Sequence, residues 1–332
     1  MGTLDGRVAI ITGAGRGIGR EHALLFASEG AKVVVNDLGG DIHGEGEDRA
    51  PAQQVVDEIT TMGGEAVANT DSVADFEGAK RLVDLAVETF GDLHVLVNNA
   101  GILRDRVLVN MTEDEWDSVI LVHLKGHFCP TKHAAVYWRE QAKAGKEGDR
   151  SIINTSSTSG VLGNAGQANY GAAKAGIASF SNICAMELGR YGVRSNAITP
   201  MARTRLTETT PGLEDVVKAP TDAAEFDEWH PANVSPVIAY LGTEACPFTG
   251  ETFFVQGDIL ARYQPYVIAE KIKNDGERWT VERLERIDAI WTPTAHQMTN
   301  IQDGARSRLE LVEIRYGVEI PDEVFGRAHL GR

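Results

Sequence analysis

Short apolar runs alternate along the chain with segments in which apolar residues recur every three or four positions. The runs lie at 7–11, 32–36, 65–69, 93–97 and 151–155, and the periodic segments at 20–28, 52–62 and 76–90. The runs have the length of buried strands and the periodic segments that of amphipathic helices. Strands that alternate with helices favour parallel pairing. The pattern therefore predicts an α/β fold, a doubly wound parallel sheet of about seven strands with helices on both faces.

Two more strands and a long loop are predicted beyond the fifth strand. The strands lie at 196–199 and 250–257, with a short helix at 234–241 before the last one. The segment 201–230 is polar, contains two prolines and is a candidate lid. The segment 38–51 is rich in glycine and charge, which indicates a surface insertion. We expect the core to include Val8, Val34, Val95, Ile153 and Phe254.

The last part of the chain, from about residue 261, contains three further segments. The segments 266–273 and 281–290 have helical spacing, and 301–332 combines a charged helix with a short strand-like piece. We expect a C-terminal helical extension at 261–332, because the family resemblance described below ends at about residue 260. The extension is expected to pack on the core or at a dimer interface. The alternative is that it forms a wall of the substrate pocket.

Composition and charge exclude several classes of protein. The formal net charge of −16 argues against nonspecific binding to nucleic acid or to an anionic membrane, because both need a basic surface. No apolar stretch is long enough to span a membrane, and a signal-peptide core is absent, so we expect a cytoplasmic protein. Cys129, Cys184 and Cys246 lack metal-binding spacing. We expect them to be reduced core thiols, with neither a disulfide nor a metal.

A glycine-rich turn joins the first strand to the first helix. Its sequence is Thr12-Gly-Ala-Gly-Arg-Gly-Ile-Gly19. Glycines let the backbone approach a pyrophosphate, and the free N–H groups of the helix favour negative charge there. The second strand leads to Asp37, whose carboxylate is placed to bind the adenosine ribose of NAD. Arg16 could instead accept the 2′-phosphate of NADP, but repulsion between that phosphate and Asp37 favours NAD.

Small and polar residues also follow the third and fourth strands. Asp71 and Ser72 are expected to border the adenine, and Asn98-Asn-Ala-Gly101 permits a flat ligand to lie against the backbone. Because the carboxyl ends of parallel strands meet at one edge of a sheet, these residues should line one site.

Tyr170 and Lys174 stand four residues apart and share one face of a predicted helix. Ser157 follows the strand 151–155, so that three polar groups could meet around one carbonyl. A nearby ammonium stabilises phenolate and lowers the pKa of tyrosine from its usual ~10. The spacing therefore predicts an acid/base site. The alternative is a packed tyrosine ring beside a solvated lysine.

Taken together, the glycine turn, 98–101, Ser157 and Tyr170-x-x-x-Lys174 resemble the short-chain dehydrogenase/reductase family from about residue 5 to about residue 260. The segments 35–41, 99–106 and 163–170 resemble more closely the (3R)-hydroxyacyl-CoA dehydrogenase portion of peroxisomal multifunctional enzyme type 2. The resemblance implies a Rossmann-like NAD-binding and catalytic domain at 1–260. It also implies an acyl-CoA or steroid substrate and a homodimer or homotetramer.

The resemblance assigns a role to each residue of the acid/base site. It implies that Tyr170 removes the hydroxyl proton, that Ser157 binds the substrate oxygen, and that Lys174 binds the nicotinamide ribose and lowers the pKa of Tyr170. The residues expected to contact the cofactor are Gly13, Arg16, Gly17, Ile18, Gly19, Asp37, Leu38, Asp71, Ser72, Asn99, Ala100, Gly101, Tyr170, Lys174, Pro200 and Thr204.

Two positions depart from the family pattern. His123 stands where the family commonly has an asparagine of a proton relay, and it could conduct protons or pack as a neutral core residue. Met201 replaces the glycine that usually follows the proline, which leaves the path of that loop open. Four arginines flank the site: Arg104, Arg106, Arg203 and Arg205. They either contact CoA phosphates or pair with acids such as Asp105 and Glu208.

The sequence therefore predicts NAD-dependent oxidation of a (3R)-3-hydroxyacyl-CoA, with a fatty or steroid side-chain acyl group. One alternative is a hydroxysteroid dehydrogenase that acts on the steroid ring. Another is a 3-oxoacyl-thioester reductase, which Asp37 disfavours. A dinucleotide-sensing regulator without catalysis is the remaining alternative, and it would not need Ser157, Tyr170 and Lys174 together.

Overall fold

The chain divides into two compact units, Met1–Pro265 and Tyr266–Arg332. The computed structural model describes residues 2–40, 43, 46, 48–146, 148–204, 207, 216–222, 225–264, 268, 273–274, 276–281, 293–303 and 306–316. The boundary implied by the family resemblance, residue 260, lies five residues before the end of the first unit.

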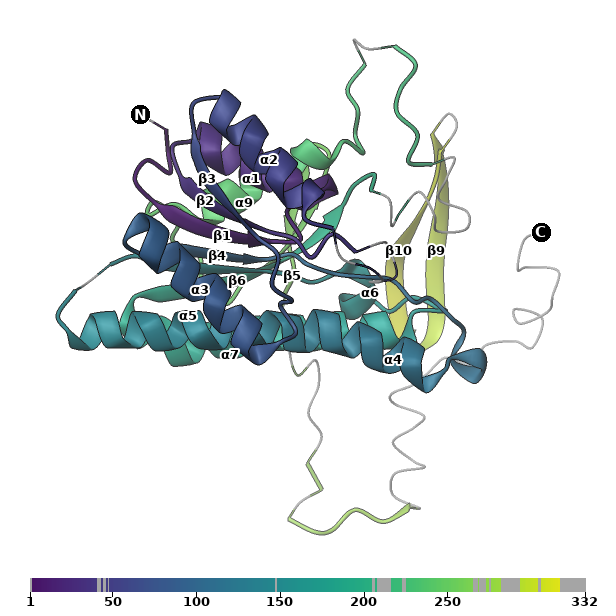
Figure 1. Cartoon of the computed structure of the whole chain (residues 1–332). Coiled ribbons are helices and arrows are strands. Elements are labelled where there is room, and N and C mark those ends of the chain that lie inside the picture. Colours follow the sequence, from purple (N-terminus) through teal and green to yellow (C-terminus); the bar gives the residue numbers. More distant parts are fainter. Residues whose placement is uncertain are drawn as a thin grey trace. The chain divides into compact units, whose positions relative to one another are not determined.

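The first unit is built on an eight-stranded sheet in the order β3-β2-β1-β4-β5-β6-β7-β8 (Figure 1). The strands are β1 (Val8–Thr12), β2 (Lys32–Asn36), β3 (Glu65–Asn69), β4 (Val95–Asn98), β5 (Arg150–Thr155), β6 (Val193–Met201), β7 (Thr252–Gln256) and β8 (Ile259–Arg262). Neighbouring strands from β3 to β7 pair in parallel, and β8 pairs antiparallel with β7. The predicted doubly wound parallel sheet is confirmed, with β8 as an added edge strand.

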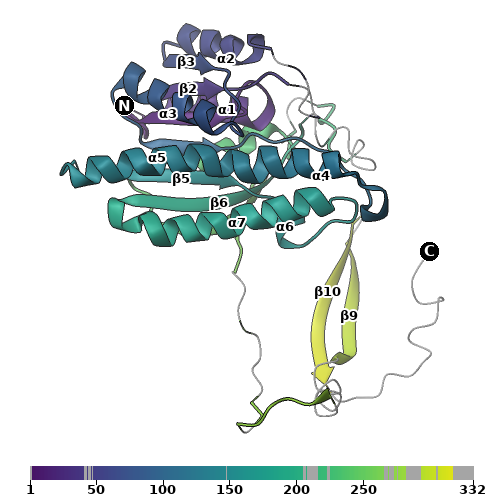
Figure 2. The same ribbon diagram turned by 60° about the horizontal axis from the view of Figure 1, so that its bottom comes forward.

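Helices cover both faces of the sheet (Figures 1 and 2). One face carries α1 (Gly17–Ser28), α2 (Ala50–Thr61) and α9 (Ser235–Leu241), and the other carries α3 (Phe76–Phe90), α5 (Gly126–Lys143) and α7 (Ala168–Leu188). The helix α4 (Glu113–Ile120) continues into α5 through a π-helical turn, η2 (Leu121–Lys125), and α6 (Thr158–Val161) precedes α7. Single 3-10 turns are η1 (Leu108–Asn110), η3 (Gly189–Tyr191) and η4 (Pro231–Asn233).

The core lies between the sheet and its two helical layers. Of the predicted core residues, Val8, Val34, Val95 and Ile153 are buried. The prediction for Phe254 is wrong, because this side chain is only half-buried. Strand β7 alternates, so that Phe253 and Val255 are the residues that face the core.

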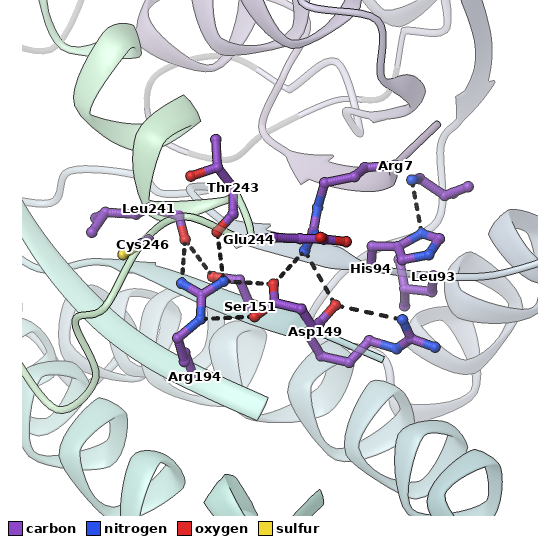
Figure 3. A network of polar contacts seen from close by, with 12 residues as sticks. Arg7, Leu93, His94, Asp149, Ser151, Arg194, Leu241, Thr243, Glu244 and Cys246 are labelled. Carbon is purple, nitrogen blue, oxygen red and sulfur yellow. Dashed lines mark hydrogen bonds and ion pairs between the residues drawn. The ribbon is translucent and has the colours of Figure 1, made fainter. Parts of the chain in front are cut away.

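A network of ion pairs joins three strands at their amino ends (Figure 3). Asp149, which directly precedes β5, accepts hydrogen bonds from Arg7 Nη2 at 3.0 Å and from Arg194 Nη2 at 2.6 Å. Arg194 also donates to the carbonyl oxygens of Leu241 and Thr243, at the end of α9 and just beyond it. The network therefore ties β1, β5 and β6 to the end of α9, on the opposite side of the sheet from the strands' carboxyl ends.

In the second unit, the described residues include two antiparallel strands, β9 (Pro293–Asp303) and β10 (Arg306–Tyr316). The predicted helices at 266–273 and 281–290 lie almost entirely outside the described residues. The prediction of a charged helix in 301–332 is wrong for 306–316, where charged and apolar residues alternate from Arg308 to Leu311 as in a strand. The packing of the extension on the core or at a dimer interface stays a prediction.

Candidate active site

One cavity of about 390 Å³ opens where the parallel strands end at their carboxyl edge. Its lining residues follow β1, β2, β3, β4, β5 and β6 in turn. All the sequence-predicted residues line it: Gly13, Arg16, Gly17, Ile18, Gly19, Asp37, Leu38, Asp71, Ser72, Asn99, Ala100, Gly101, Ser157, Tyr170, Lys174, Pro200 and Thr204. The fold therefore brings together residues that are spread over almost 200 positions of the sequence, as expected for strands that end at one edge.

The turn after β1 has the close backbone packing that only glycine permits. Gly13 has a φ of 63°, and a Cβ there would lie 2.8 Å from the Cα of Ala100. A Cβ on Gly19 would lie 2.1 Å from the carbonyl oxygen of Gly13. No side chain caps the first N–H groups of α1, and its first turn contains no acidic residue. These free donors and the open backbone fit the pyrophosphate of a dinucleotide.

Hydrogen bonds of the Thr12 and Asn99 side chains join the ends of β1 and β4. The Thr12 hydroxyl accepts hydrogen bonds from the backbone N–H groups of Asn99 and Ala100, at 2.9 and 3.1 Å. The Asn99 amide nitrogen donates to the carbonyl oxygens of Thr12 and Gly13, at 3.0 and 3.2 Å. Asn99 thus holds the glycine turn in place. Thr12 was not predicted as a site residue, although its position at a strand end could have indicated it.

Asp37 is fixed at the rim of the glycine turn by two backbone donors. Its Oδ2 accepts from Gly15 N at 2.8 Å and its Oδ1 from Gly39 N at 2.7 Å. Arg16 donates from Nη1 to the carbonyl oxygen of Gly40 at 3.4 Å. The carboxylate and the guanidinium, which favour different cofactors, therefore lie on the same cavity, and the carboxylate is the more firmly held of the two.

The end of β3 is ordered by a separate set of polar contacts. The Asn36 amide donates to Asn69 Oδ1 at 2.7 Å and to the carbonyl oxygen of Asp71 at 2.9 Å. The Asp71 carboxylate pairs with Arg81 of α3 and accepts from Asn69 Nδ2. Since its carboxylate is engaged, Asp71 can border a nucleotide with its backbone while its charge holds the loop.

Ser157, Tyr170 and Lys174 meet on one wall of the cavity. Ser157 is the N-cap of α6, and its hydroxyl oxygen accepts from Ser159 N at 3.2 Å and is hydrogen-bonded to Tyr170. Lys174 is buried; its Nζ lies 5.4 Å from the centre of the Tyr170 ring and donates to the carbonyl oxygen of Thr155 at 2.6 Å. The three groups thus converge as the spacing predicts.

Burial opposes charge on both members of the tyrosine–lysine pair. Burial raises the pKa of Tyr170 to about 12, an effect reduced by the hydrogen bond with Ser157 and reinforced by the Asp105 carboxylate. Burial likewise lowers the pKa of Lys174 to about 7. We expected Lys174 to lower the pKa of Tyr170. In the structure the loss of hydration raises the pKa of Tyr170 instead, the lowering contribution comes from Ser157, and the neutral tyrosine is favoured.

His123 lies in the π-helical turn, buried beside Tyr170. Its ring stands edge-on to the Tyr170 ring with 5.1 Å between the ring centres, and its Nε2 lies 3.1 Å from Ile102 N and 2.8 Å from Ile102 O. Burial and the charge of Lys174 lower the pKa of His123 well below its usual range. The structure thus favours a neutral, packed histidine over one that titrates near neutral pH. π-Helical turns often mark functional sites.

Met201, which replaces the usual glycine of the family, does not interrupt the end of β6. Pro200 and Met201 remain in β6, paired with Val255 and Gln256 of β7. Thr204 then donates its backbone N–H to the Thr207 hydroxyl at 2.7 Å and lines the cavity. The strand pairing therefore defines the path up to residue 201.

Three of the four arginines proposed to contact CoA phosphates have protein partners in the structure. Arg106 pairs with Glu115 at 3.0 Å, and Arg203 donates from Nη1 to Asp227 Oδ1 at 3.1 Å. Arg104 donates to the carbonyl oxygen of His43 at 3.1 Å. Arg205 and Glu208 lie outside the described residues. The partners of Arg106 and Arg203 thus differ from the acids that we expected.

Four polar side chains beside the acid/base site were not predicted as site residues. They are Asp105, Ser159, Asn164 and Gln167, and the last three line the cavity. Asn164 and Gln167 belong to the segment 163–170, which served only to support the resemblance. The sequence feature that could have indicated them is their position as polar residues just before the helix that contains Tyr170.

Neither metal ligation nor membrane insertion is indicated in the part of the chain that the structure describes. There, no group of three or more His, Cys, Asp or Glu side chains could hold a metal ion. No described helix has both the length and the hydrophobicity that a membrane span requires. Cys129, Cys184 and Cys246 are free and buried, as expected of core thiols.

Comparison with known families identifies two matches along the chain. A family model described as short chain dehydrogenase matches residues 7–213. A second model, described only as an uncharacterized protein, matches residues 270–332. The first match contains the glycine turn, the serine, the tyrosine and the lysine, and the second lies within the second compact unit.

Individual proteins are similar over most of the chain. Peroxisomal multifunctional enzyme type 2 of Drosophila melanogaster is 49% identical over 246 residues, which cover 74% of this chain and 38% of that protein. Hydroxyacyl-CoA dehydrogenase ChsB1 of Mycobacterium tuberculosis is 41% identical over 288 residues, 85% of this chain and 87% of that protein. The crystal structure of a short chain dehydrogenase from Mycobacterium avium superposes with a TM-score of 0.76 at 49% identity, covering 87% of this chain and 95% of that one.

Proposed function

The chain belongs to the short-chain dehydrogenase family of oxidoreductases, and on that premise we propose that it oxidises a (3R)-3-hydroxyacyl-CoA to the 3-oxoacyl-CoA with NAD. The main support for the proposal is that Ser157, Tyr170 and Lys174 line the same cavity as the glycine turn. The names of the similar proteins supply the substrate class, to which we add a fatty or steroid side-chain acyl group.

The cofactor half of the cavity supports NAD. The free N–H groups of α1 and the open backbone at Gly13 would hold the pyrophosphate, and Asp37 would accept hydrogen bonds from the adenosine ribose hydroxyls. A 2′-phosphate would lie against the Asp37 carboxylate, which two backbone N–H groups hold in place. Repulsion between these like charges would disfavour NADP more than Arg16 could favour it.

The chain's own residues would move the proton. When bound, NAD supplies the hydride acceptor. Tyr170, as phenolate, would accept the proton of the substrate hydroxyl, while Ser157 donates a hydrogen bond to the same oxygen. Lys174 in its ammonium form would stabilise the phenolate from one turn along α7 and bind the nicotinamide ribose. Burial favours the neutral forms of Tyr170 and Lys174, so the mechanism would need the ammonium form of Lys174 to offset the cost of a buried phenolate.

We also propose that the protein is a homodimer or homotetramer. Large apolar side chains are exposed on α5 and α7, namely Phe128, Ile183 and Met186. Exposed large apolar residues on these two helices would fit a contact surface between subunits. Light scattering of the purified protein would measure the assembly, and Met186→Glu should weaken it.

The decisive experiment follows NADH formation on a racemic 3-hydroxyacyl-CoA, with NAD and NADP compared. We expect turnover with NAD that stops when half the racemate is consumed, since only one enantiomer presents its hydroxyl to Tyr170. Tyr170→Phe removes a single oxygen and is the matched control. It should lose turnover while NADH binding, followed by fluorescence, persists. A protein that binds NADH but oxidises neither a fatty nor a steroid side-chain thioester would refute the proposal.

A further inference from the structure

The side chain of Gln167 connects three segments beside the catalytic wall. Gln167 is the N-cap of α7, buried at 8% exposure, three residues before Tyr170. Its amide nitrogen donates to Asp105 Oδ2 at 2.7 Å, and its amide oxygen accepts from Ser159 Oγ at 2.7 Å and from Asn164 Nδ2 at 3.0 Å. The amide group of Gln167, at the start of α7, is therefore hydrogen-bonded both to the loop after β4 and to helix α6.

The carboxylate of Asp105 decides which way this amide points. An ionised carboxylate can only accept hydrogen bonds, so the Gln167 nitrogen must face Asp105 and the oxygen must face Ser159. The backbone N–H of Ser159 in turn donates to Ser157 Oγ at 3.2 Å. Because Ser157 Oγ accepts this bond, its own proton remains available for Tyr170 or for a substrate oxygen.

Backbone contacts keep Asp105 against Gln167 although its carboxylate stays partly solvated. Arg106 N donates to the carbonyl oxygen of Gly166 at 2.8 Å, directly beside both residues. The amide of Asn169, in the first turn of α7, donates to the carbonyl oxygen of Arg104 at 3.0 Å. The loop after β4 is thus attached to the start of α7 on both sides of the Asp105–Gln167 bond.

We propose that Gln167, oriented by Asp105, is a positioning residue that fixes the first turn of α6 and directs the hydroxyl proton of Ser157 toward the reacting oxygen. The proposal rests on the proposed oxidation of a hydroxyl group. Gln167 acts on Ser157 through Ser159, and removing its donor or reversing its orientation would turn the Ser157 hydroxyl away from Tyr170.

A donor–acceptor exchange tests the proposal. Gln167→Glu removes the N–H that faces Asp105 and sets two carboxylates against each other. We expect kcat to fall roughly tenfold or more, the usual effect of an unmatched buried polar pair, with NADH affinity unchanged. Adding Asp105→Asn restores a donor from the opposite side, so that the introduced carboxylate again accepts from Ser159 and Asn164. The double variant should recover kcat to within about threefold of the parent.

The ionisation of Tyr170 gives a second readout that does not need turnover. The titratable groups that face Tyr170 are Asp105 from the loop after β4, His123 from η2 and Lys174 from α7. Gln167→Glu adds a negative charge on this side, so Tyr170 should ionise at a higher pH, whereas the double variant carries the parent's charge and should return to the parent's value. Phenolate absorbance, taken as the difference from the matching Tyr170→Phe protein, measures this.

A surface pair of the same chemistry provides the control. On α2, Gln53 Nε2 donates to Asp57 Oδ1 at 2.8 Å in an exposed position, and Gln53→Glu should leave kcat and the Tyr170 titration unchanged. Two results would overturn the proposal. One is a double variant as slow as Gln167→Glu. The other is a pH of Tyr170 ionisation that does not rise in Gln167→Glu or does not return to the parent's value in the double variant. An inactive parent would refute the substrate class alone, because the titration would still decide the role of Gln167.

Discussion

The Nζ atom of Lys174 lies 5.4 Å from the centre of the Tyr170 ring and is held there by a hydrogen bond to the carbonyl oxygen of Thr155. This arrangement places an amine in a buried position where burial lowers its pKa to about 7. The site therefore holds a group that is destabilising when charged, as expected where function and stability conflict.

The first prediction is that Lys174→Met stabilises the protein in a pH-dependent way. The pKa of Lys174 is about 7 in the folded chain and ~10.4 in the unfolded one, so the unfolded state binds more protons between these values. The destabilisation by Lys174 is thus complete below pH 7 and disappears as pH rises toward ~10.4. The difference between these two pKa values corresponds to a gain of about 4 to 5 kcal/mol below pH 7.

Urea unfolding at several pH values measures this gain. The exposed Lys125→Met is the control, and its effect should be small and independent of pH. A stabilisation by Lys174→Met that is the same at pH values below 7 and near 10 would contradict the inferred burial cost. The variant should also lose dehydrogenase activity under the proposed mechanism.

The second prediction concerns cofactor choice. Asp37→Ser removes the carboxylate that Gly15 N and Gly39 N hold at the turn, while Arg16 remains on the same cavity. We expect the ratio of kcat/KM for NAD to that for NADP to fall roughly a hundredfold, because a like-charge contact is replaced by a hydroxyl. Arg16→Ser is the paired control and should move the ratio in the opposite direction. An unchanged ratio in Asp37→Ser would show that the carboxylate does not select the cofactor.

The strand ends explain why so much of the site could be predicted from the sequence. Gly13, Asp37 and Asn99 each follow a short apolar run, and parallel strands bring their carboxyl ends to one edge. Such a prediction needs only the order of elements and no knowledge of side-chain packing. The same holds for Tyr170 and Lys174, whose spacing fixes their common helix face.

Features that depend on contacts between distant segments could not be predicted. Asp105 and Gln167 stand 62 positions apart, and only the packing of the loop after β4 on α7 brings them together. The π-helical turn around His123 likewise has no local sequence signature. The error at Phe254 has another origin, since alternation in a strand shows that successive residues face opposite sides but leaves open which side is the core.

The third prediction tests the contact between Gly101 and His123. A Cβ on Gly101 would lie 2.4 Å from His123 Cε1, and the buried ring is already packed edge-on against Tyr170. Gly101→Ala should therefore push the ring onto Tyr170 and lower kcat roughly tenfold or more, as overpacking of a core does. In a His123→Asn background the smaller side chain leaves room for the methyl group. The double variant should then be within about threefold of His123→Asn alone.

Steady-state kinetics of the four proteins measure this coupling. An equal loss from Gly101→Ala in both backgrounds would place the clash elsewhere. Because the pKa of His123 is already well below its usual range, the pH profile of the parent should show no limb near pH ~6.5 that disappears in His123→Asn.

The last prediction separates stability from function at the opposite end of the sheet. Asp149 is the anion shared by Arg7 and Arg194, whose side chains are 5% and 14% exposed. Asp149→Asn keeps the shape of the side chain but leaves two buried guanidinium groups without their shared counter-charge. We expect the free energy of unfolding to fall by about 3 kcal/mol, the usual effect of breaking a buried ion pair. Turnover at moderate temperature should be retained, because the network lies away from the cavity.

Urea unfolding with parallel activity assays checks both parts of this prediction. The exposed Lys80–Asp84 pair on α3 provides the control, and Asp84→Asn should change stability by less than about 0.5 kcal/mol. A loss in Asp149→Asn no larger than in Asp84→Asn would mean that water compensates the two arginines. A loss of kcat in folded Asp149→Asn would instead show that the amino ends of the strands influence the cavity at their carboxyl ends.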